Sequence, residues 1–247
     1  MSFSLVAGLG NPGRAYEGTR HNLGWIVLDA FARRHGLVWK QSAEFKAAFA
    51  RWETGAGPVW RAKPQTFMNA SGESVGALAR YFKAVPESVI AVHDDLNLDL
   101  GLIKVSAGGS AGGHNGVDSL IRHLGPGFVR YRLGIGPKRP PEMDLADFVL
   151  ARFPPDQLVV VTEKTESFVQ GLELLLNRGL ETALTQLNRR DPKCNPPTAT
   201  TAPPSSSTTG ARRSPSTRSS TESRRSSPSS RVRSRPSRTS ASATSPA

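Results

Sequence analysis

Four short segments of this sequence carry side chains of the types that perform acid–base catalysis. Each segment follows an apolar run, and together they contain Asn11, His21, Asn69, Asp94 and Asn115. Imidazole titrates near neutral pH, so it can accept a proton from water, and a carboxylate can orient its ring. A carboxamide offers two donors and one acceptor without titrating. These residue types indicate general acid–base chemistry if the fold brings the segments together.

The first segment also has the spacing G-x-G-x-x-G, which is typical of dinucleotide-binding loops. It is the run GLGNPG at 8–13, which follows a short apolar strand. A dinucleotide site needs a helix that starts inside this loop and faces the pyrophosphate. Gly13 and Gly18 disfavour such a helix, and Asp29, at the spacing of the ribose-binding acid, falls within a later helix. We therefore expect a sharp turn that presents Asn11.

A metal site is a further interpretation of the same segments. His93, Asp94 and Asp95 are adjacent, and His114 lies in a later glycine-rich run. Imidazole and carboxylate groups both bind divalent ions. The helical spacings H-E-x-x-H and H-x-x-E-H are absent from the sequence, however. We expect no metal and no other cofactor.

The segments that must position these side chains alternate between strand and helix. Short β-branched runs predict strands at 4–9, 88–93, 104–106 and 131–135, and a hairpin with a long turn at 45–51 and 59–62. Apolar residues at helical spacing predict helices at 23–34, 71–82, 116–123, 155–177 and 180–188. This alternation predicts an α/β fold, a single domain with a mixed, mainly parallel sheet flanked by helices. Ligands of such sheets bind at the carboxyl ends of the strands, so one shared cleft is expected.

Composition changes near Asp191. From Pro196 onward the chain has nine arginines and one glutamate, so +8 of the net charge of +12 lies there and only +4 remains for the first 195 residues. Large apolar residues are nearly absent from this segment, which predicts disorder. We expect a folded domain at 1–190 and a disordered basic tail at 191–247. The tail is either an arm that touches RNA or a solvated extension, and the frequency of charge runs in such tails favours the extension.

Cysteine content and hydropathy indicate the compartment. The one cysteine, Cys194, excludes a disulfide within the chain and a thiolate metal cluster. The N-terminus lacks the basic start and apolar run of a signal peptide. No apolar run reaches the roughly 18 residues of a membrane span. We expect a cytoplasmic protein that does not contact a membrane.

Four motifs, in this order, resemble the bacterial peptidyl-tRNA hydrolase family. They are GLGNPG…Y…TRHN, KPQTFMN, HDDLN and GGSAGGHNG. The resemblance covers about residues 4–188 and implies an enzyme that hydrolyses the ester between a peptide, or an N-blocked amino acid, and tRNA. It also implies a monomer that uses no cofactor and binds the acceptor stem and the peptide of peptidyl-tRNA. Ser106 is a departure, because many relatives have a basic residue there.

The resemblance implies a role for each matched residue. His21 is the general base that activates water, and Asp94 orients its ring. No serine or cysteine is expected to act as a nucleophile in these motifs, so direct attack by water is favoured over an acyl-enzyme. Asn11 helps to distinguish a blocked amino group from a free one, while Asn69 and Asn115 bind substrate. The alternative for the three asparagines is a turn or a helix cap.

Apolar walls and phosphate-binding cations complete the predicted site. Tyr16, Phe67 and Met68 are expected to line the peptide site, and core packing is the alternative for each. Lys104 and Arg132 are expected to contact tRNA phosphates, which position the acceptor stem without reading sequence. They come from a basic group that consists of Lys104, Arg130, Arg132, Lys138 and Arg139.

A binding protein without catalysis is the main alternative function. Some plant organellar splicing factors resemble this family and serve as RNA-binding modules. Such a module need not keep a histidine, its carboxylate and three asparagines, and this chain has all five. The combination favours a hydrolase.

Overall fold

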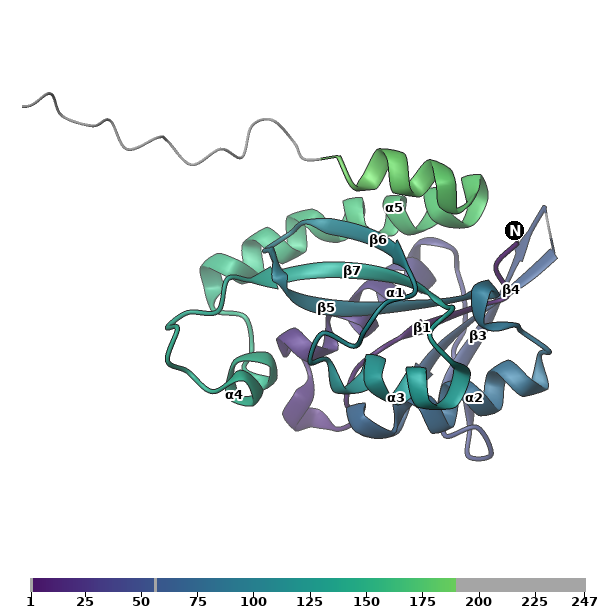
Figure 1. Ribbon diagram of the computed structural model, residues 1–247, viewed down its shortest axis with the longest axis horizontal. Helices are drawn as coiled ribbons and strands as arrows, with labels where there is room; N and C mark the ends of the chain where they lie inside the picture. Colours follow the sequence, from purple (N-terminus) through teal and green to yellow (C-terminus); the bar gives the residue numbers. More distant parts are fainter. Residues whose placement is uncertain (1, 56, 190–247) are drawn as a thin grey trace, which may run out of the picture. The chain divides into compact units, whose positions relative to one another are not determined.

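A seven-stranded mixed sheet forms the centre of the computed structural model, which describes residues 2–55 and 57–189 (Figure 1). The strands are β1 (Leu5–Gly8), β2 (Lys40–Ser42), β3 (Ala47–Thr54), β4 (Gly57–Pro64), β5 (Val89–Asp99), β6 (Ile103–Ala107) and β7 (Val129–Gly136). Their order is β2-β3-β4-β1-β5-β7-β6. The predicted tail at 191–247 lies outside the described residues.

The four inner strands run parallel, and antiparallel strands close both edges. β1 pairs with β4 and β5, and β5 pairs with β7, all in parallel. β2–β3, β3–β4 and β6–β7 are antiparallel pairs. All four residues of β1 are buried, as in a strand covered on both faces. The predicted mixed α/β sheet is confirmed, and its parallel strands end at one edge.

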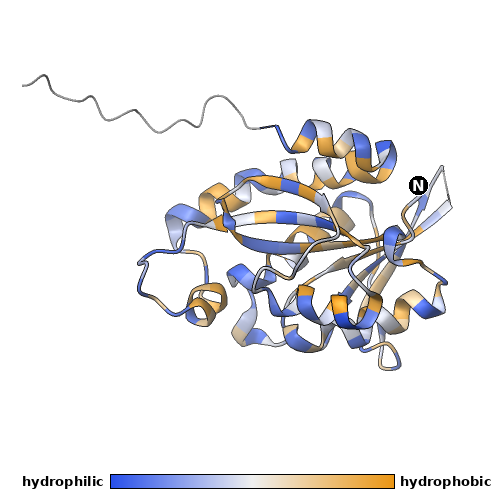
Figure 2. Ribbon diagram, in the orientation of Figure 1, coloured by the Kyte–Doolittle hydropathy of each residue, from blue (hydrophilic) through white to orange (hydrophobic). Residues whose placement is uncertain are grey.

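Helices cover both faces of the sheet. They are α1 (Leu23–Arg34), α2 (Ser71–Tyr81), α3 (Asn115–Leu124), α4 (Leu145–Leu150) and α5 (Pro155–Leu187), with short 3₁₀ turns η1 (Arg14–Tyr16), η2 (Arg20–Asn22), η3 (Met68–Ala70) and η4 (Pro86–Ser88). α1 and α5 lie on one face, and α2 and α3 lie on the other (Figure 1). The helices alternate between blue and orange in Figure 2, as amphipathic helices do. No described helix is long and apolar enough to cross a membrane.

Two apolar clusters fill the space between the sheet and these helices. Phe31, Tyr131 and Phe168 are buried in the cluster under α1 and α5. Leu78 and Phe128 are buried in the cluster under α2 and α3. Where α1 begins, Gly24 has no room for a side chain, because a Cβ would lie 2.4 Å from the carbonyl oxygen of Val92. This close approach holds the start of α1 against the ends of β1 and β5.

The end of α5 is attached to the edge strand β6. The side-chain amide of Asn188 donates to the carbonyl oxygen of Val105 at 2.9 Å, and its oxygen accepts from the Val105 N–H at 2.7 Å. Gly179 interrupts α5 with a φ of 81°, at the boundary between the two helices that the sequence predicts. The last helical segment can therefore fold back along the sheet.

Several features differ from the sequence expectation, and one of them is the strand β2, which was not predicted. The hairpin turn is short rather than long, because Thr54 pairs with Gly57. β5 continues past His93 to Asp99, since β7 offers pairing partners even where the side chains are polar. The helix α4 was not predicted, because its six residues are too few for a recognisable period.

Candidate active site

A cleft of about 890 Å³ lies at the edge where the parallel strands end. Its walls come from the turns after β1 and β4, the polar end of β5, the glycine-rich segment at 108–113 and α4. Of the residues predicted from the sequence, those that line it are Asn11, His21, Phe67, Met68, Asn69, Asp94, Asn115 and Arg132. Tyr16 and Lys104 do not line it. Segments far apart in the sequence therefore meet here as expected.

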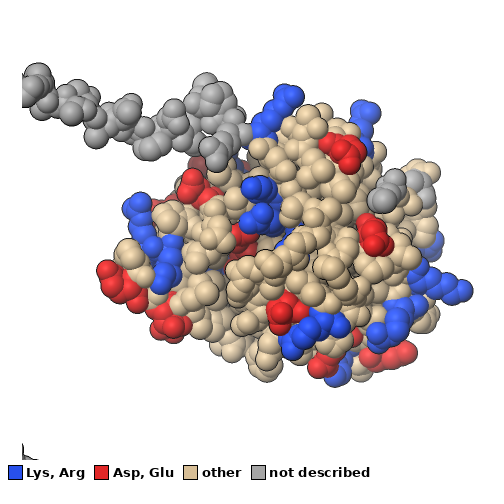
Figure 3. All heavy atoms as spheres, viewed as in Figure 1, with Lys and Arg blue, Asp and Glu red and all other residues tan. Residues whose placement is uncertain are grey.

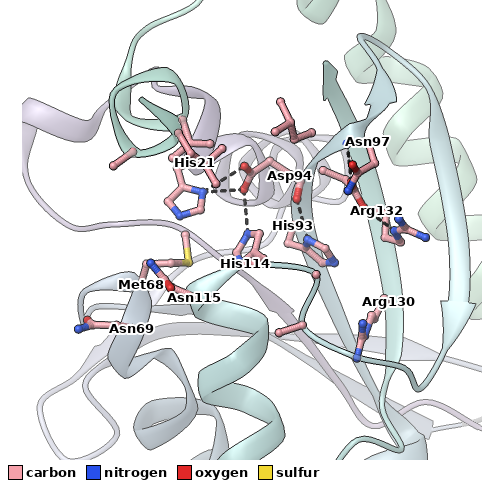
Figure 4. A pocket seen from close by; sticks show the side chains of 18 of the residues that line it. His21, Met68, Asn69, His93, Asp94, Asn97, His114, Asn115, Arg130 and Arg132 are labelled. Atoms are coloured by element: carbon pink, nitrogen blue, oxygen red, sulfur yellow. Dashed lines mark hydrogen bonds and ion pairs between the residues drawn. The ribbon is translucent and has the colours of Figure 1, made fainter. Parts of the chain in front are cut away.

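Asp94 is the centre of a hydrogen-bonded chain in this cleft. Nδ1 of His21 lies 2.9 and 3.1 Å from the two carboxylate oxygens, and Nε2 of His114 lies 3.0 Å from Oδ1 (Figure 4). Asp94 as a whole residue is 2% exposed. Since Nδ1 of His21 faces the carboxylate, Nε2 is the ring nitrogen left for the cleft, and Figure 4 shows it pointing toward Met68.

The tautomer of His114 follows from its second set of contacts. Its Nδ1 caps α3 by accepting from the backbone N–H groups of Gly116 at 3.1 Å and Val117 at 3.3 Å. The neutral ring therefore carries its proton on Nε2 and donates it to Asp94. The sequence marked His114 only as a possible metal ligand. From the sequence we did not recognise that a helix starts directly after His114, so that His114 is in position to cap it.

A divalent ion would compete with this hydrogen-bonded chain. The ligand atoms of His21, Asp94 and His114 lie within 4.8 Å of one another, which is close enough to surround an ion. However, an ion would have to displace the Nε2 proton of His114 and the hydrogen bonds of His21 and His114 to Asp94. The donor set is better matched to proton chemistry than to metal binding.

Burial and neighbouring charges set the protonation of the two central groups on β5. Burial raises the pKa of Asp94, but His21 and His114 outweigh it, and the pKa lies well below its usual range. Burial, together with His114, lowers the pKa of His93 to about 3. The neutral His93 donates from Nδ1 to the backbone carbonyl of Asp94 at 2.7 Å. Asp94 is therefore a charged carboxylate held from both sides.

Asn11 is held by three hydrogen bonds that orient its amide. Its backbone N–H donates to Oδ1 of Asn22, and its carbonyl accepts from Nδ2 of Asn22, both at 2.9 Å. Its side-chain oxygen accepts from the Met68 N–H at 2.7 Å. The oxygen is thus occupied, so the amide NH₂ is the part available to a ligand. From the sequence we did not predict that Asn22 binds the backbone of Asn11, although Asn22 belongs to the motif TRHN.

Asn69 and Asn115 lie at the rim of the cleft with exposed side chains. Within residues 2–55 and 57–189, neither amide makes a hydrogen bond. They are not helix caps either, because Ala70 precedes α2 without a side-chain cap and His114 caps α3. Their amides are available for an outside partner, and their role in binding substrate stays a prediction.

Close packing brings the apolar wall against the start of α3. A Cβ on Gly116 would lie 2.4 Å from the sulfur of Met68, so a side chain here would require Met68 to move. Phe67 is 57% exposed, and its ring meets that of Tyr16 edge to face at 6.1 Å. Phe67 therefore lines the cleft, whereas Tyr16, which was also expected to line it, contacts the Phe67 ring and does not.

The basic residues divide into two groups. Lys104 and Arg132 are directly opposite each other on β6 and β7, and Nε of Arg132 lies 2.5 Å from a carboxylate oxygen of Asp95. Figure 3 shows blue side chains over this part of the sheet, next to a red one. In contrast, Arg130 donates to the carbonyls of the glycine-rich segment, and Lys138 donates to the Met143 carbonyl. Arg130 and Lys138 therefore bind backbone carbonyl oxygens, whereas Arg132 is paired with the Asp95 carboxylate.

Comparison with known proteins identifies the family. The family model described as peptidyl-tRNA hydrolase matches residues 5–195. The chain belongs to the peptidyl-tRNA hydrolase family. This confirms the resemblance carried by the four sequence motifs, and the match ends before the basic part of the tail.

Individual members of the family agree with this match. The peptidyl-tRNA hydrolase of Gloeobacter violaceus is 42% identical over 194 residues, which cover 77% of this chain and 96% of that protein. That of Symbiobacterium thermophilum is 44% identical over 188 residues, covering 74% and 98%. The crystal structure of peptidyl-tRNA hydrolase from Acinetobacter baumannii superposes with a TM-score of 0.70 at 32% identity, covering 75% and 94%.

Proposed function

We propose that this protein hydrolyses the ester bond between a peptide, or an N-blocked amino acid, and tRNA, and so releases free tRNA. One observation carries the proposal. Nδ1 of His21 is bound to the buried carboxylate of Asp94, while Nε2 points into a cleft that Asn11 also lines. A base and a neutral donor in one cleft are what direct attack of water on an ester requires.

The reaction begins when Nε2 of His21 takes a proton from water. The resulting hydroxide forms a bond to the ester carbonyl carbon, and the carbonyl oxygen becomes an oxyanion. The charged Asp94 stabilises the imidazolium, and the NH₂ group of Asn11 donates to the oxyanion. When the C–O bond to the ribose breaks, His21 returns its proton to the ribose oxygen. The products are free tRNA and the carboxylic acid of the peptide.

His114 supports this cycle through a second hydrogen bond to Asp94. Its Nε2 proton is donated to the same oxygen that His21 contacts at 2.9 Å. A second donor lowers the proton affinity of the carboxylate, so that Asp94 stays charged while His21 is protonated. The proton therefore remains on His21 for transfer to the leaving ribose.

The two ends of the cleft differ in polarity, which gives the substrate a direction. Lys104 and Arg132 mark the side of β6 and β7, where phosphates of the acceptor stem would bind. Phe67, Met68 and α4 form the apolar side. The acyl chain would lie along this side, and Asn69 and Asn115 would bind its backbone.

We propose that the working unit is a monomer, as the family resemblance implies. We also propose that the protein acts in the cytoplasm, as its single cysteine suggests. The family match to residue 195 supports a division into a catalytic domain at 1–190 and a tail at 191–247.

The test is release of free tRNA from N-acetyl-aminoacyl-tRNA by the purified full-length protein. We expect turnover that depends on His21 and is unchanged by a chelator. Binding of tRNA without turnover would instead support the RNA-binding alternative. Loss of turnover with chelator, and its recovery on adding a divalent ion, would favour a metal-dependent hydrolase.

A further inference from the structure

One guanidinium joins the turn that carries His21 to the end of α4. Nη1 of Arg20 lies 3.2 Å from the Phe148 carbonyl oxygen, 3.3 Å from that of Ala151 and 3.1 Å from that of Arg152. Nη2 donates to the side-chain oxygen of Gln157 at 2.9 Å. Arg20 is 5% exposed, so these contacts are made inside the protein.

The guanidinium also lies against aromatic rings. It lies 4.3 Å from the ring centre of Phe148 and 5.3 Å from that of Phe153. The backbone follows the same path, because the Arg20 N–H donates to the Ala151 carbonyl at 3.1 Å. A lysine could not reproduce this arrangement, since it has one nitrogen where the planar guanidinium presents several donors in fixed directions.

The short helix α4 therefore has two faces with different partners. Phe148 is buried on the face that meets Arg20. Leu145, Val149 and Leu150 lie on the face that lines the cleft, and Leu145 remains 43% exposed there. This apolar wall of the cleft is thus attached directly to the residue before the proposed base.

We propose that Arg20 is a positioning residue that fixes α4 beside His21, and that the apolar face of α4 thereby makes the enzyme prefer substrates with an apolar acyl side chain. This inference rests on the proposed function, because it concerns the acyl group of the same ester. Since Arg20 and His21 share one 3₁₀ turn, the wall and the base keep a constant separation. A displacement of about 1 Å can cost a large factor in rate, so this separation matters for turnover.

The experiment compares two acyl groups on one RNA, N-acetyl-phenylalanyl and N-acetyl-glycyl esters of the same tRNA. We expect the wild type to have the higher kcat/KM for the phenylalanyl ester. In Arg20→Met this preference should fall by roughly 10-fold, the scale of a lost apolar contact. Arg20→Lys should keep part of the preference. Hydrogen exchange at 145–152 should be faster in both variants.

A second variant tests α4 without touching Arg20. The double substitution Leu145→Ala, Val149→Ala changes only partly exposed positions, and it should also reduce the preference. If Arg20→Met does not fold, this double variant still tests whether α4 determines the acyl preference. Arg34→Met is the matched control, because Arg34 binds Glu166 and Glu173 away from the cleft and its loss should leave the preference unchanged.

The outcomes separate this inference from the proposed function. A wild type that hydrolyses both esters equally would overturn the inference and leave the function intact. An equal fall for both esters in Arg20→Met would show a merely structural role. Preference retained in the α4 double variant would also contradict the inference. A wild type that hydrolyses neither ester would overturn the proposed function itself.

Discussion

The side-chain oxygen of Asn11 accepts a hydrogen bond from the backbone N–H of Met68 at 2.7 Å, which fixes the rotation of the amide. The turn after β1 and the turn after β4 are thereby joined across the cleft. Since the oxygen is occupied, the NH₂ group can only donate to a ligand. Asn11, which lines the cleft, therefore offers a donor to a bound ligand.

Asn11→Asp separates the two functions of this side chain. Aspartate keeps an oxygen for the Met68 N–H, so the turn should stay in place, but it has no donor and brings a negative charge next to the oxyanion. We expect kcat to fall by roughly 10²–10³, the scale of a lost oxyanion donor. Steady-state kinetics with N-acetyl-aminoacyl-tRNA measure this. A kcat within a factor of a few of the wild type would assign Asn11 to structure alone.

Loss of the base should affect turnover more than binding. His21→Ala is expected to lower kcat by roughly 10²–10⁴, as for removal of a general base. Asp94→Asn should lower kcat as well. Both histidines need an acceptor at this residue, and the NH₂ group of asparagine would face one of them as a donor. The dissociation constant for tRNA should change little in either variant. Single-turnover rates, measured beside a binding isotherm, distinguish these effects, and rapid hydrolysis by His21→Ala would remove this base from the mechanism.

The buried His93 predicts a loss of stability in mild acid. Its folded-state pKa of about 3 is below the usual 6.5, so the unfolded chain binds a proton first as the pH falls. Unfolding is therefore favoured progressively between about pH 6.5 and pH 3, by on the order of 4 kcal/mol in total. His93→Gln removes this titration. Urea unfolding of both proteins at pH 7, 6, 5 and 4 should give a flatter profile for the variant.

The carboxylates affect stability at lower pH than His93 does, so the two effects can be distinguished. Asp94 and Asp95 have lowered pKa values, so the stability that they contribute is present above about pH 4 and is lost below it. Wild-type and His93→Gln profiles should therefore differ mainly above pH 4. Parallel profiles over the whole range would show that His93 is not the cause.

Phosphate binding should depend on Lys104 and Arg132. Each change to glutamine is expected to weaken tRNA binding about equally for different tRNAs and to lower the salt slope by about 1. Arg132→Gln should cost more, because it also leaves the Asp95 carboxylate unpaired beside a phosphate. Lys40→Gln, at the opposite edge of the sheet, is the control. A loss confined to one tRNA would argue against a positioning role.

A chain that ends at Arg189 should retain its turnover number. The family motifs and Asn188 remain, while the segment with +8 of the net charge is removed. Affinity at low salt should fall slightly, and the difference should fade as ionic strength rises. Saturation kinetics of both chains across a salt series provide the comparison. A large fall in kcat would mean that the removed segment takes part in catalysis.

Sequence periodicity predicted those elements that bury a regular apolar face. The helix over 23–34 has the predicted bounds because its apolar residues repeat at helical spacing. The extension of β5 past His93 was missed, because the continuous apolar run stops before His93 and the polar residues His93, Asp94 and Asp95 follow it. α4 was missed because Phe148 is buried only through contacts with distant segments.

The predicted site residues could be collected from the motifs, but their hydrogen-bond directions could not. Arg20 was not predicted as a site residue although it directly precedes His21. The Phe148 carbonyl oxygen that it binds lies 128 residues later in the sequence. The tautomer of His114 depends on a helix start, and the donor side of Asn11 depends on a turn from another strand. Such contacts arise only when the fold brings these segments together.

The attachment of Asn188 to Val105 also bears on self-association. β6 is the last strand of the sheet, and an unpaired strand edge invites pairing with a second chain. The amide of Asn188 occupies both the N–H and the carbonyl of Val105, as a backbone group of another strand would. α5 thus ends by blocking the middle of an edge that would otherwise be a template for aggregation.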